Sequence, residues 1–179
     1  AEDLVDEIIE YVDTNRIQEE LNIVQELISE IKQFRRYHTE RKYIELEDLL
    51  LGADGLLNQE EKLLIFTESV DTLTFLKKRL SFHVDHIAIL QGSQSMKERL
   101  TQIEYFKKDA QIMIATDAGG ESINLQFCNQ LVNYDIPWNP NKLEQRMGRI
   151  HRIGQQNDVL IVNMVANNTR EGYVLTKLF

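Results

Sequence analysis

The sequence predicts an α/β protein in which helices flank a mostly parallel sheet, with a helical segment in front of it. From Lys62 onward, short apolar runs alternate with amphipathic stretches, which is the pattern of strand–helix–strand crossover units. Before Lys62, apolar residues recur at helical spacing instead. A chain of 179 residues with 42% hydrophobic content can bury one sizeable core. We therefore expect a helical segment at 1–61 and an α/β domain at 62–179.

The first third of the chain predicts three helices. Apolar side chains recur at helical spacing over Leu4–Val12 and over Ile17–Ile31, and Asn15 is placed to cap the second helix. A third, shorter helix covers "RKYIELEDLL" and ends at Gly52, where "GADG" predicts a turn. We expect a helical layer that buries its apolar faces against the next unit. A linker or partner-binding role is the alternative.

Five strands are predicted in the second part, the first of them buried. Their sequences are, in chain order, "KLLIFTE", "HIAIL", "QIMIAT", "QLVNYD" and "DVLIVNMV". A flexible, glycine-containing loop, "DAGGESINLQ", is expected after the third of them. Open sheets of this kind bind ligands beyond the carboxyl ends of their strands, so these ends are where a functional site is expected.

The helices between these strands have recognisable starts and apolar faces. Ser69 is placed to cap the first, and Ser95 with Glu98 has the capping-box spacing in front of the second. Asn139 and Pro140 open a third helix, and a closing helix is expected after Thr169. The predicted apolar faces consist of Leu73, Leu76 and Leu80 in the first helix and Met96, Leu100, Ile103 and Phe106 in the second.

The negative charge of the chain is confined to its first third. The net charge is −9, which argues against a nucleic-acid partner at first sight. However, residues 1–62 hold 17 acidic and 7 basic residues, a net of −10, whereas residues 63–179 hold 12 acidic and 13 basic residues, a net of +1. The second part is therefore compatible with phosphate chemistry.

Composition also bounds compartment and cysteine chemistry. No uninterrupted apolar run approaches the 18 or so residues of a membrane span, and "AEDLVDEIIE" lacks the features of a secretory signal. We expect a cytoplasmic protein that does not associate with membranes. The single cysteine, Cys128, cannot form an intrachain disulfide or a cysteine-based metal site, so we expect a small buried hydrophobic residue.

Polar and glycine residues follow the second and third strands. Gly92 allows close backbone approach, and Ser93 offers a donor at a helix start, which suits a phosphate, although a plain capped turn has the same sequence. Asp117, Gly119 and Gly120 follow the third strand and could line a ligand site. Taken alone, each of these signals is weak.

The stretch "QRMGRIHRIG" spaces three arginines three residues apart, at Arg146, Arg149 and Arg152. In a helix these side chains would share one face and repel each other by roughly 0.2–0.5 kcal/mol per pair. Such an arrangement favours an anionic ligand. The plain alternative is that basic residues complement the carboxyl end of a helix.

These motifs resemble a known family. "KLLIFTES", "LQGSQSMKER", "IATDAGGESINLQ", "DIPWNPNKLEQRMGRIHRIGQ" and "NNTREGYV" occur in the order and spacing of the second RecA-like lobe of superfamily-two helicases. The "PWNPNKLEQRMGRIHRIGQ" block is most similar to the SWI/SNF-type translocases, especially their bacterial RapA-like branch. The resemblance covers roughly residues 62–176 and implies a three-layer, RecA-like sheet of the P-loop NTPase type.

The resemblance implies that ATP and Mg²⁺ bind in the cleft between two lobes, held mainly by an N-terminal lobe of the same polypeptide. The second lobe would deliver arginine fingers, and on the pattern Q-x-x-G-R-x-x-R these are Arg149 and Arg152. Gln145 and Gly148 match the same pattern, and Asn124 lies where the family places a polar residue near the ribose. Arg146 falls at a variable position and would only pair with a nearby acid.

The resemblance also implies contacts with nucleic acid, and we expect duplex DNA. Gly92, Ser93 and Arg99 match the element that holds the phosphate backbone, although Arg99 could equally be a surface residue of its helix. Thr116 and the segment Asp117–Gly120 would touch the strand or couple it to ATP. His151 lies between the fingers, and packing or hydrogen bonding is favoured for it over catalysis.

The sequence departs from the family pattern in two respects. Ser122 stands where the family usually has glycine, which puts local coupling in doubt. No G-x-x-x-x-G-K-[ST] motif occurs, so we expect half of a motor that is inactive by itself. Two alternatives remain, namely a stand-alone binding or regulatory module and a lobe of an RNA helicase.

Overall fold

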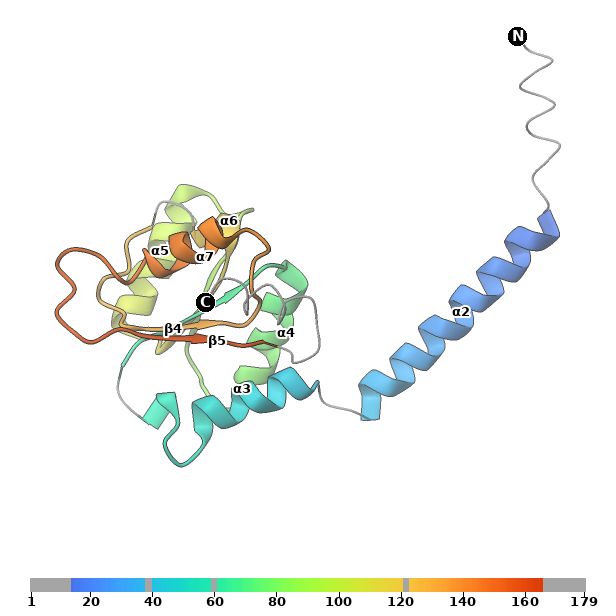
Figure 1. Ribbon diagram of the computed structural model, residues 1–179, viewed down its shortest axis with the longest axis horizontal. Helices are drawn as coiled ribbons and strands as arrows, with labels where there is room; N and C mark the ends of the chain where they lie inside the picture. Colours follow the sequence, from blue (N-terminus) through green and yellow to red (C-terminus); the bar gives the residue numbers. More distant parts are fainter. Residues whose placement is uncertain (1–13, 38–39, 59–60, 121–122, 166–179) are drawn as a thin grey trace, which may run out of the picture. The chain divides into compact units, whose positions relative to one another are not determined.

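The computed structural model describes residues 14–37, 40–58, 61–120 and 123–165 (Figure 1). The chain divides into two compact units, Ala1–Arg41 and Lys42–Phe179. In the first unit, helix α2 spans Thr14–Tyr37 and confirms the helix predicted over Ile17–Ile31. Asn15 lies within α2, which is helical from the first described residue, Thr14, so its predicted capping position is wrong. The helices predicted over Leu4–Val12 and after Thr169 lie outside the described residues.

The second unit contains a five-stranded parallel sheet, as predicted. The strands are β1 (Leu63–Thr67), β2 (Ile87–Leu90), β3 (Ile112–Thr116), β4 (Gln130–Asn133) and β5 (Leu160–Asn163). Their order is β2-β3-β1-β4-β5, and every neighbouring pair is parallel. Every residue of β1, β3 and β4 is buried, as expected for strands covered on both faces. The carboxyl ends of all five strands therefore meet at one edge.

The connecting helices follow the predicted starts. They are α3 (Arg41–Leu51), α4 (Val70–Leu80), α5 (Met96–Lys108), α6 (Asp117–Gly120) and α7 (Pro140–Met147), with a 3₁₀ turn at Leu56–Asn58. Ser69 caps α4, Asn139 caps α7, and Ser95 with Glu98 forms the predicted capping box of α5. Hydrogen bonds from the Ser95 hydroxyl and amide hold the pKa of the Glu98 carboxyl below its usual value.

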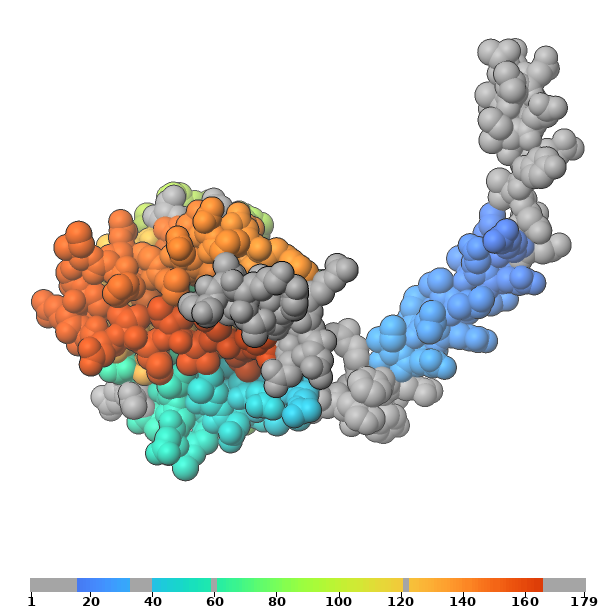
Figure 2. Space-filling model, in the orientation of Figure 1, coloured from blue at the N-terminus to red at the C-terminus, as the bar shows by residue number. Residues whose placement is uncertain are grey.

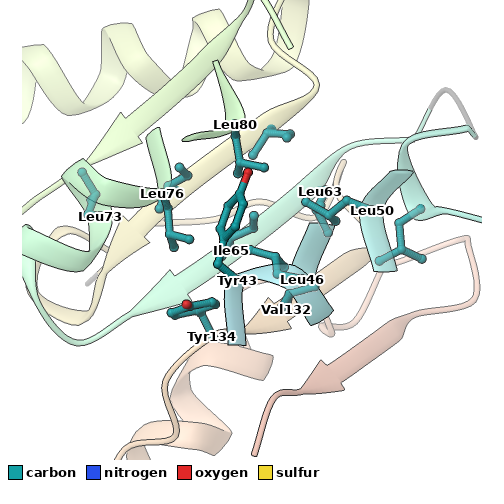
Figure 3. Packing of buried hydrophobic residues seen from close by; sticks show 13 residues of the cluster. Tyr43, Leu46, Leu50, Leu63, Ile65, Leu73, Leu76, Leu80, Val132 and Tyr134 are labelled. Carbon is teal, nitrogen blue, oxygen red and sulfur yellow. The ribbon is translucent and has the colours of Figure 1, made fainter. Parts of the chain in front are cut away.

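One face of the sheet is covered by α3 and α4 (Figures 1 and 3). The ring of Tyr43 lies edge-on to that of Phe75, with ring centroids 5.6 Å apart. Burial raises the pKa of Tyr43 to about 12, with a further contribution from the neighbouring Glu47 carboxylate. The buried core of this face consists of Tyr43, Leu46, Leu50, Leu56, Leu63, Ile65, Leu73, Leu76, Leu80, Ile112, Ile114, Val132 and Tyr134.

The opposite face is covered by α5 and by the segments around α7. Phe106 of α5 is fully buried, whereas Met96 and Leu100 are exposed, so the predicted apolar face of this helix covers the sheet with its C-terminal half only. Cys128 is buried in this core, and desolvation raises its pKa to about 12, as expected for an inert thiol. The three-layer arrangement of helix, sheet and helix is thereby complete.

Two local expectations differ from the structure. The segment Asp117–Gly120, expected to be part of a flexible loop, is a short helix because its glycines pack closely against β1 and β2. Helix α3, which was predicted as part of the helical segment 1–61, buries Tyr43, Leu46 and Leu50 in the core of the second unit. By packing, α3 therefore goes with the sheet. The linker role of the segment before Lys62 stays a prediction.

Leu46→Ala tests whether α3 is part of the folding unit. Leu46 is fully buried in the core, so removing its side chain should lower the free energy of unfolding by about 2–5 kcal/mol. Ile44→Ala on the same helix is the control, because Ile44 is 50% exposed. Urea denaturation of both variants and the parent measures the effect. Equal costs for the two substitutions would mean that α3 does not pack as described.

Candidate functional site

Polar side chains meet at the carboxyl edge of the sheet. Thr67, the last residue of β1, donates its hydroxyl to Asp135 Oδ2 at 2.5 Å. Asn133, the last residue of β4, donates its amide to Asn163 Oδ1 of β5 at 2.8 Å. Side-chain hydrogen bonds therefore join strand ends that are already adjacent in the sheet. Buried polar groups need such partners, because an unpaired one would destabilise the fold.

The guanidinium of Arg146 lies in the middle of this edge and is 2% exposed. Its Nε donates to Asp117 Oδ1 at 2.6 Å, and its Nη1 donates to the Asp135 carbonyl oxygen at 2.6 Å and to Asn133 Oδ1 at 3.2 Å. The ring of Phe66 faces it, with Cζ 5.2 Å from the ring centroid. Arg146 therefore does pair with an acid, as predicted, and it also joins α7 to α6 and to the end of β4.

A small cavity of about 30 Å³ opens beside Arg146. It is lined by Phe66, Asp117, Gly120, Lys142, Gln145, Arg146 and Arg149. Two of the predicted ATP-side residues, Gln145 and Arg149, therefore lie together with the predicted strand-exit residues Asp117 and Gly120. Typical small-molecule sites measure about 300–1,000 Å³, so this cavity alone does not enclose a nucleotide.

The three arginines do not share one helical face. Helix α7 ends at Met147 with Gly148 as its C-cap, so only Arg146 is helical and the expected crowding does not arise. Arg149 is half-buried, and its amide donates to the Arg146 carbonyl oxygen at 3.0 Å. Arg152 is exposed, in a surface segment visible in orange to red in Figure 2. Arg146 is the basic residue in the last turn of α7, whereas Arg149 and Arg152 follow its C-cap.

Arg152 lines a second cavity, of about 390 Å³, together with His151, Gln155, Asn157, Asp158, Val159 and Ile161. The two predicted fingers therefore line different cavities. Neither Arg149 nor Arg152 makes a side-chain ion pair or hydrogen bond with a residue in the described ranges. Both guanidiniums are thus available to an anionic ligand, in contrast to Arg146.

The turn after β2 contains the next group of predicted residues. Gly92 and Ser93 are exposed, and the Arg99 guanidinium donates to the carbonyl oxygens of Gly92, at 3.1 Å, and Gln94, at 3.2 Å. Arg99 therefore braces this turn from the first turns of α5. Arg99 is half-buried, and its predicted contact with a phosphate backbone stays a prediction.

Glycines bring this turn into contact with the segment after β3. A Cβ atom on Gly92 would lie 2.9 Å from the Ala118 Cβ, and one on Gly119 would lie 2.5 Å from the backbone of Leu90 and Gln91. A Cβ on Gly120 would lie 2.7 Å from the Phe66 ring. The glycines are therefore needed for close approach rather than flexibility. The hydroxyl of Thr116 completes the turn by accepting from the Gly119 amide at 3.3 Å.

The remaining predicted residues lie apart from this cavity or outside the described ranges. Asn124 is exposed, and its amide donates to Gln126 Oε1 at 3.3 Å. Asn124 does not line the cavity beside Arg146. Ser122 lies outside the described residues, so its effect stays a prediction.

Sequence reasoning missed three residues that build the edge, namely Asn133, Asp135 and Lys142. Asn133 and Asp135 lie at the end of the strand predicted from "QLVNYD". Two alternate polar residues at the exit of a buried strand could have indicated that they belong to the site. Lys142 lies 3.8 Å from Asp117 Oδ2 and is half exposed, so its ion pair contributes little to stability.

In the part of the chain that the structure describes, no cluster of three or more His, Cys, Asp or Glu side chains could hold a metal ion. Among the described helices, none combines the length and the apolar character needed to cross a membrane.

Residues 41–154 match the family model for the helicase conserved C-terminal domain. The chain is 41% identical over 138 residues to an uncharacterized ATP-dependent helicase, YqhH, of Bacillus subtilis. It is 34% identical over 122 residues to the RNA polymerase-associated protein RapA of Proteus mirabilis. These alignments cover 77% and 66% of this chain but only 24% and 13% of the relatives, so the chain spans less than a quarter of either.

Solved structures agree with the fold. The C-terminal part of the Fun30 ATPase domain matches with a TM-score of 0.68 at 28% identity, over 84% of this chain and 52% of that one. The DEAD-box protein SrmB of E. coli matches with a TM-score of 0.57 at 17% identity, over 69% of each chain, and supports the fold alone. The predicted RecA-like, three-layer architecture is thereby confirmed.

Gly119→Ala tests the close contact between the exits of β2 and β3. The added methyl group would lie 2.5 Å from backbone atoms, which cannot move aside easily, so we expect a loss of about 1–3 kcal/mol of stability. Gly148→Ala is the control, because its Cβ would lie 3.3 Å from the nearest atom at an ordinary helical φ of −62°. Thermal denaturation compares the two. An unchanged midpoint for Gly119→Ala would contradict the described packing.

Proposed function

The chain belongs to the helicase conserved C-terminal domain family, within its SWI/SNF-type group, and from this membership we propose that it is the second motor lobe of an ATP-dependent nucleic-acid translocase. In this role it faces an N-terminal RecA-like lobe of the same polypeptide across a cleft that binds ATP and Mg²⁺. The N-terminal lobe holds most of the nucleotide. The present lobe supplies positive charge to the terminal phosphate.

The arrangement around Arg149 carries this proposal. Arg149 is half-buried beside the cavity at the carboxyl edge and has no acidic partner among the described residues. Phosphoryl transfer spreads negative charge over the equatorial oxygens, and a fixed guanidinium that meets this charge accelerates the reaction by about 10³–10⁵. The small volume of the cavity supports a site that a second lobe completes, since a phosphate can approach its mouth without entering it.

Arg152 is the second proposed finger, and its geometry differs from that of Arg149. Arg152 lies three residues after Arg149, is exposed and lines another cavity. For both guanidiniums to reach one phosphate, the segment after Gly148 has to adjust when the lobes close. Gln145 is proposed to contact the phosphate side of the nucleotide, and the exposed Asn124 its ribose side. Gly148 ends helix α7 between Gln145 and Arg149.

The nucleic-acid contacts are proposed at the paired exits of β2 and β3. Gly92 and Ser93 are exposed there, Arg99 braces the turn, and Thr116 with Asp117–Gly120 forms the adjoining segment. Exposed backbone amides and hydroxyls bind phosphates without reading bases. Such contacts suit an enzyme that tracks a strand, and the near-neutral charge of residues 63–179 permits them.

Duplex DNA is the proposed polymer, since the "PWNPN" block favours SWI/SNF-type enzymes over RNA helicases. An RNA helicase lobe is the second candidate, and a regulatory module without ATPase activity is the third. ATP hydrolysis by the full-length protein, measured with saturating duplex DNA, single-stranded DNA or RNA, separates them. We expect the largest stimulation with duplex DNA. Stimulation by RNA alone would favour the second candidate, and no hydrolysis at all the third.

Arg149→Ala and Arg152→Ala in the full-length protein test the finger assignment. Each should lower kcat for ATP hydrolysis by about 10³–10⁵, the contribution of an arginine finger, with an unchanged melting midpoint. His151→Ala is the matched control, because His151 lies between the two and has no assigned chemical role. Steady-state turnover at saturating ATP measures the effect. Turnover near the parent value in either variant would remove that arginine from the mechanism.

A further inference from the structure

Arg146 is the one charged side chain that is buried among the residues the structure describes. Burial of a charge is unfavourable unless partners compensate it. An exposed arginine at this position would avoid that cost, and the neighbouring Lys142 and Gln145 on α7 are exposed. The contacts that Arg146 makes must therefore offset the cost of burying its charge.

Those contacts join the two halves of the proposed mechanism. Through Nε, Arg146 holds Asp117 at the exit of β3, which belongs to the proposed nucleic-acid surface. Through its carbonyl oxygen, Arg146 accepts the amide of Arg149, the proposed finger. One residue thus touches the nucleic-acid side with its side chain and the ATP side with its backbone. No other described residue bonds to both Asp117 and Arg149.

One donor group of the Arg146 guanidinium forms no hydrogen bond. Nη2 is buried and has no hydrogen-bond partner, while Nη1 makes two hydrogen bonds, to the Asp135 carbonyl oxygen and Asn133 Oδ1. An unpaired buried donor is unfavourable, and here it belongs to a residue that lines the cavity shared by Asp117 and Arg149.

We propose that Arg146 is a positioning residue that couples nucleic-acid binding at the β3 exit to the placement of Arg149 at ATP. This inference rests on the proposed function. A strand bound at Asp117–Gly120 shifts the carboxylate of Asp117, the rigid guanidinium fork follows it, and the end of α7 carries Arg149 with it. A plain interior ion pair, by contrast, would stabilise the lobe without linking the two ligands.

The test uses the full-length protein and two measurements of kcat at saturating ATP, with and without saturating nucleic acid. Their ratio is the stimulation factor. Arg146→Gln and Arg146→Lys should lower this factor by about 5- to 150-fold, the usual range of coupling between sites. Lysine keeps the charge but cannot bond Asp117 and the Asp135 carbonyl oxygen at the same time. Arg146→Lys should therefore melt closer to the parent than Arg146→Gln does, while its stimulation factor stays low.

A double-mutant cycle with Asp117→Asn isolates the link. If the pair transmits the signal, Arg146→Gln combined with Asp117→Asn should lower the stimulation factor no further than either change alone. Because Asp117 belongs to the proposed nucleic-acid surface, the coupling is read from the double mutant and not from Asp117→Asn alone. Lys108→Gln, which removes a surface ion pair with Glu104 at 3.4 Å, is the control and should leave the factor unchanged.

The outcomes separate the two proposals. A parent enzyme whose ATP hydrolysis no nucleic acid stimulates would overturn the proposed function and the coupling with it. A stimulated parent whose Arg146 variants melt earlier but keep the parent factor would overturn the coupling alone, because that is the behaviour of a structural ion pair. Additive losses in the double mutant would likewise show that Arg146 and Asp117 act independently.

Discussion

The edge of this lobe depends on one buried cation. Parallel strands bring their carboxyl ends together, and the guanidinium of Arg146 lies among them with Asp117, Asn133 and the Asp135 carbonyl oxygen around it. A positive charge buried in this way has to be compensated by such partners. The position of α7 relative to α6 and β4 follows from that requirement.

Glycine packing gives the same edge its second constraint. Gly119 and Gly120 allow the short helix α6 to lie against the end of β2 and against Phe66 at distances that exclude a side chain. Phe66 in turn presents its ring to Arg146. The exit of β3 is therefore held between an aromatic ring and a backbone turn, and the cation, the ring and the glycines position one another. A segment held in this way transmits displacement, since packed interiors yield little to compression.

Local signals predicted the elements well, and long-range burial explains the differences. Strand runs and the capping residues Ser69, Ser95 and Asn139 depend on neighbours in sequence, and all were confirmed. The burial of Arg146 depends on Asp117, 29 residues away, which no spacing rule connects to it. The assignment of α3 to the sheet depends likewise on the distant partners of Leu46. The arginine spacing of three fits a helix, but Gly148 ends it first.

The end of α7 also separates two kinds of arginine that look alike in sequence. Arg146, inside the helix, is buried and committed to internal partners, whereas Arg149 and Arg152, beyond Gly148, have none among the described residues. A continuous helix would have stacked all three and added their mutual repulsion. Because the helix ends between the first and second arginines, Arg146 is committed to internal contacts, and the side chains of Arg149 and Arg152 have no partners among the described residues, as their proposed role requires. The proposed phosphate of a second lobe would neutralise the charge of Arg149 beside the cavity at this edge, whereas Arg152 lines a different cavity.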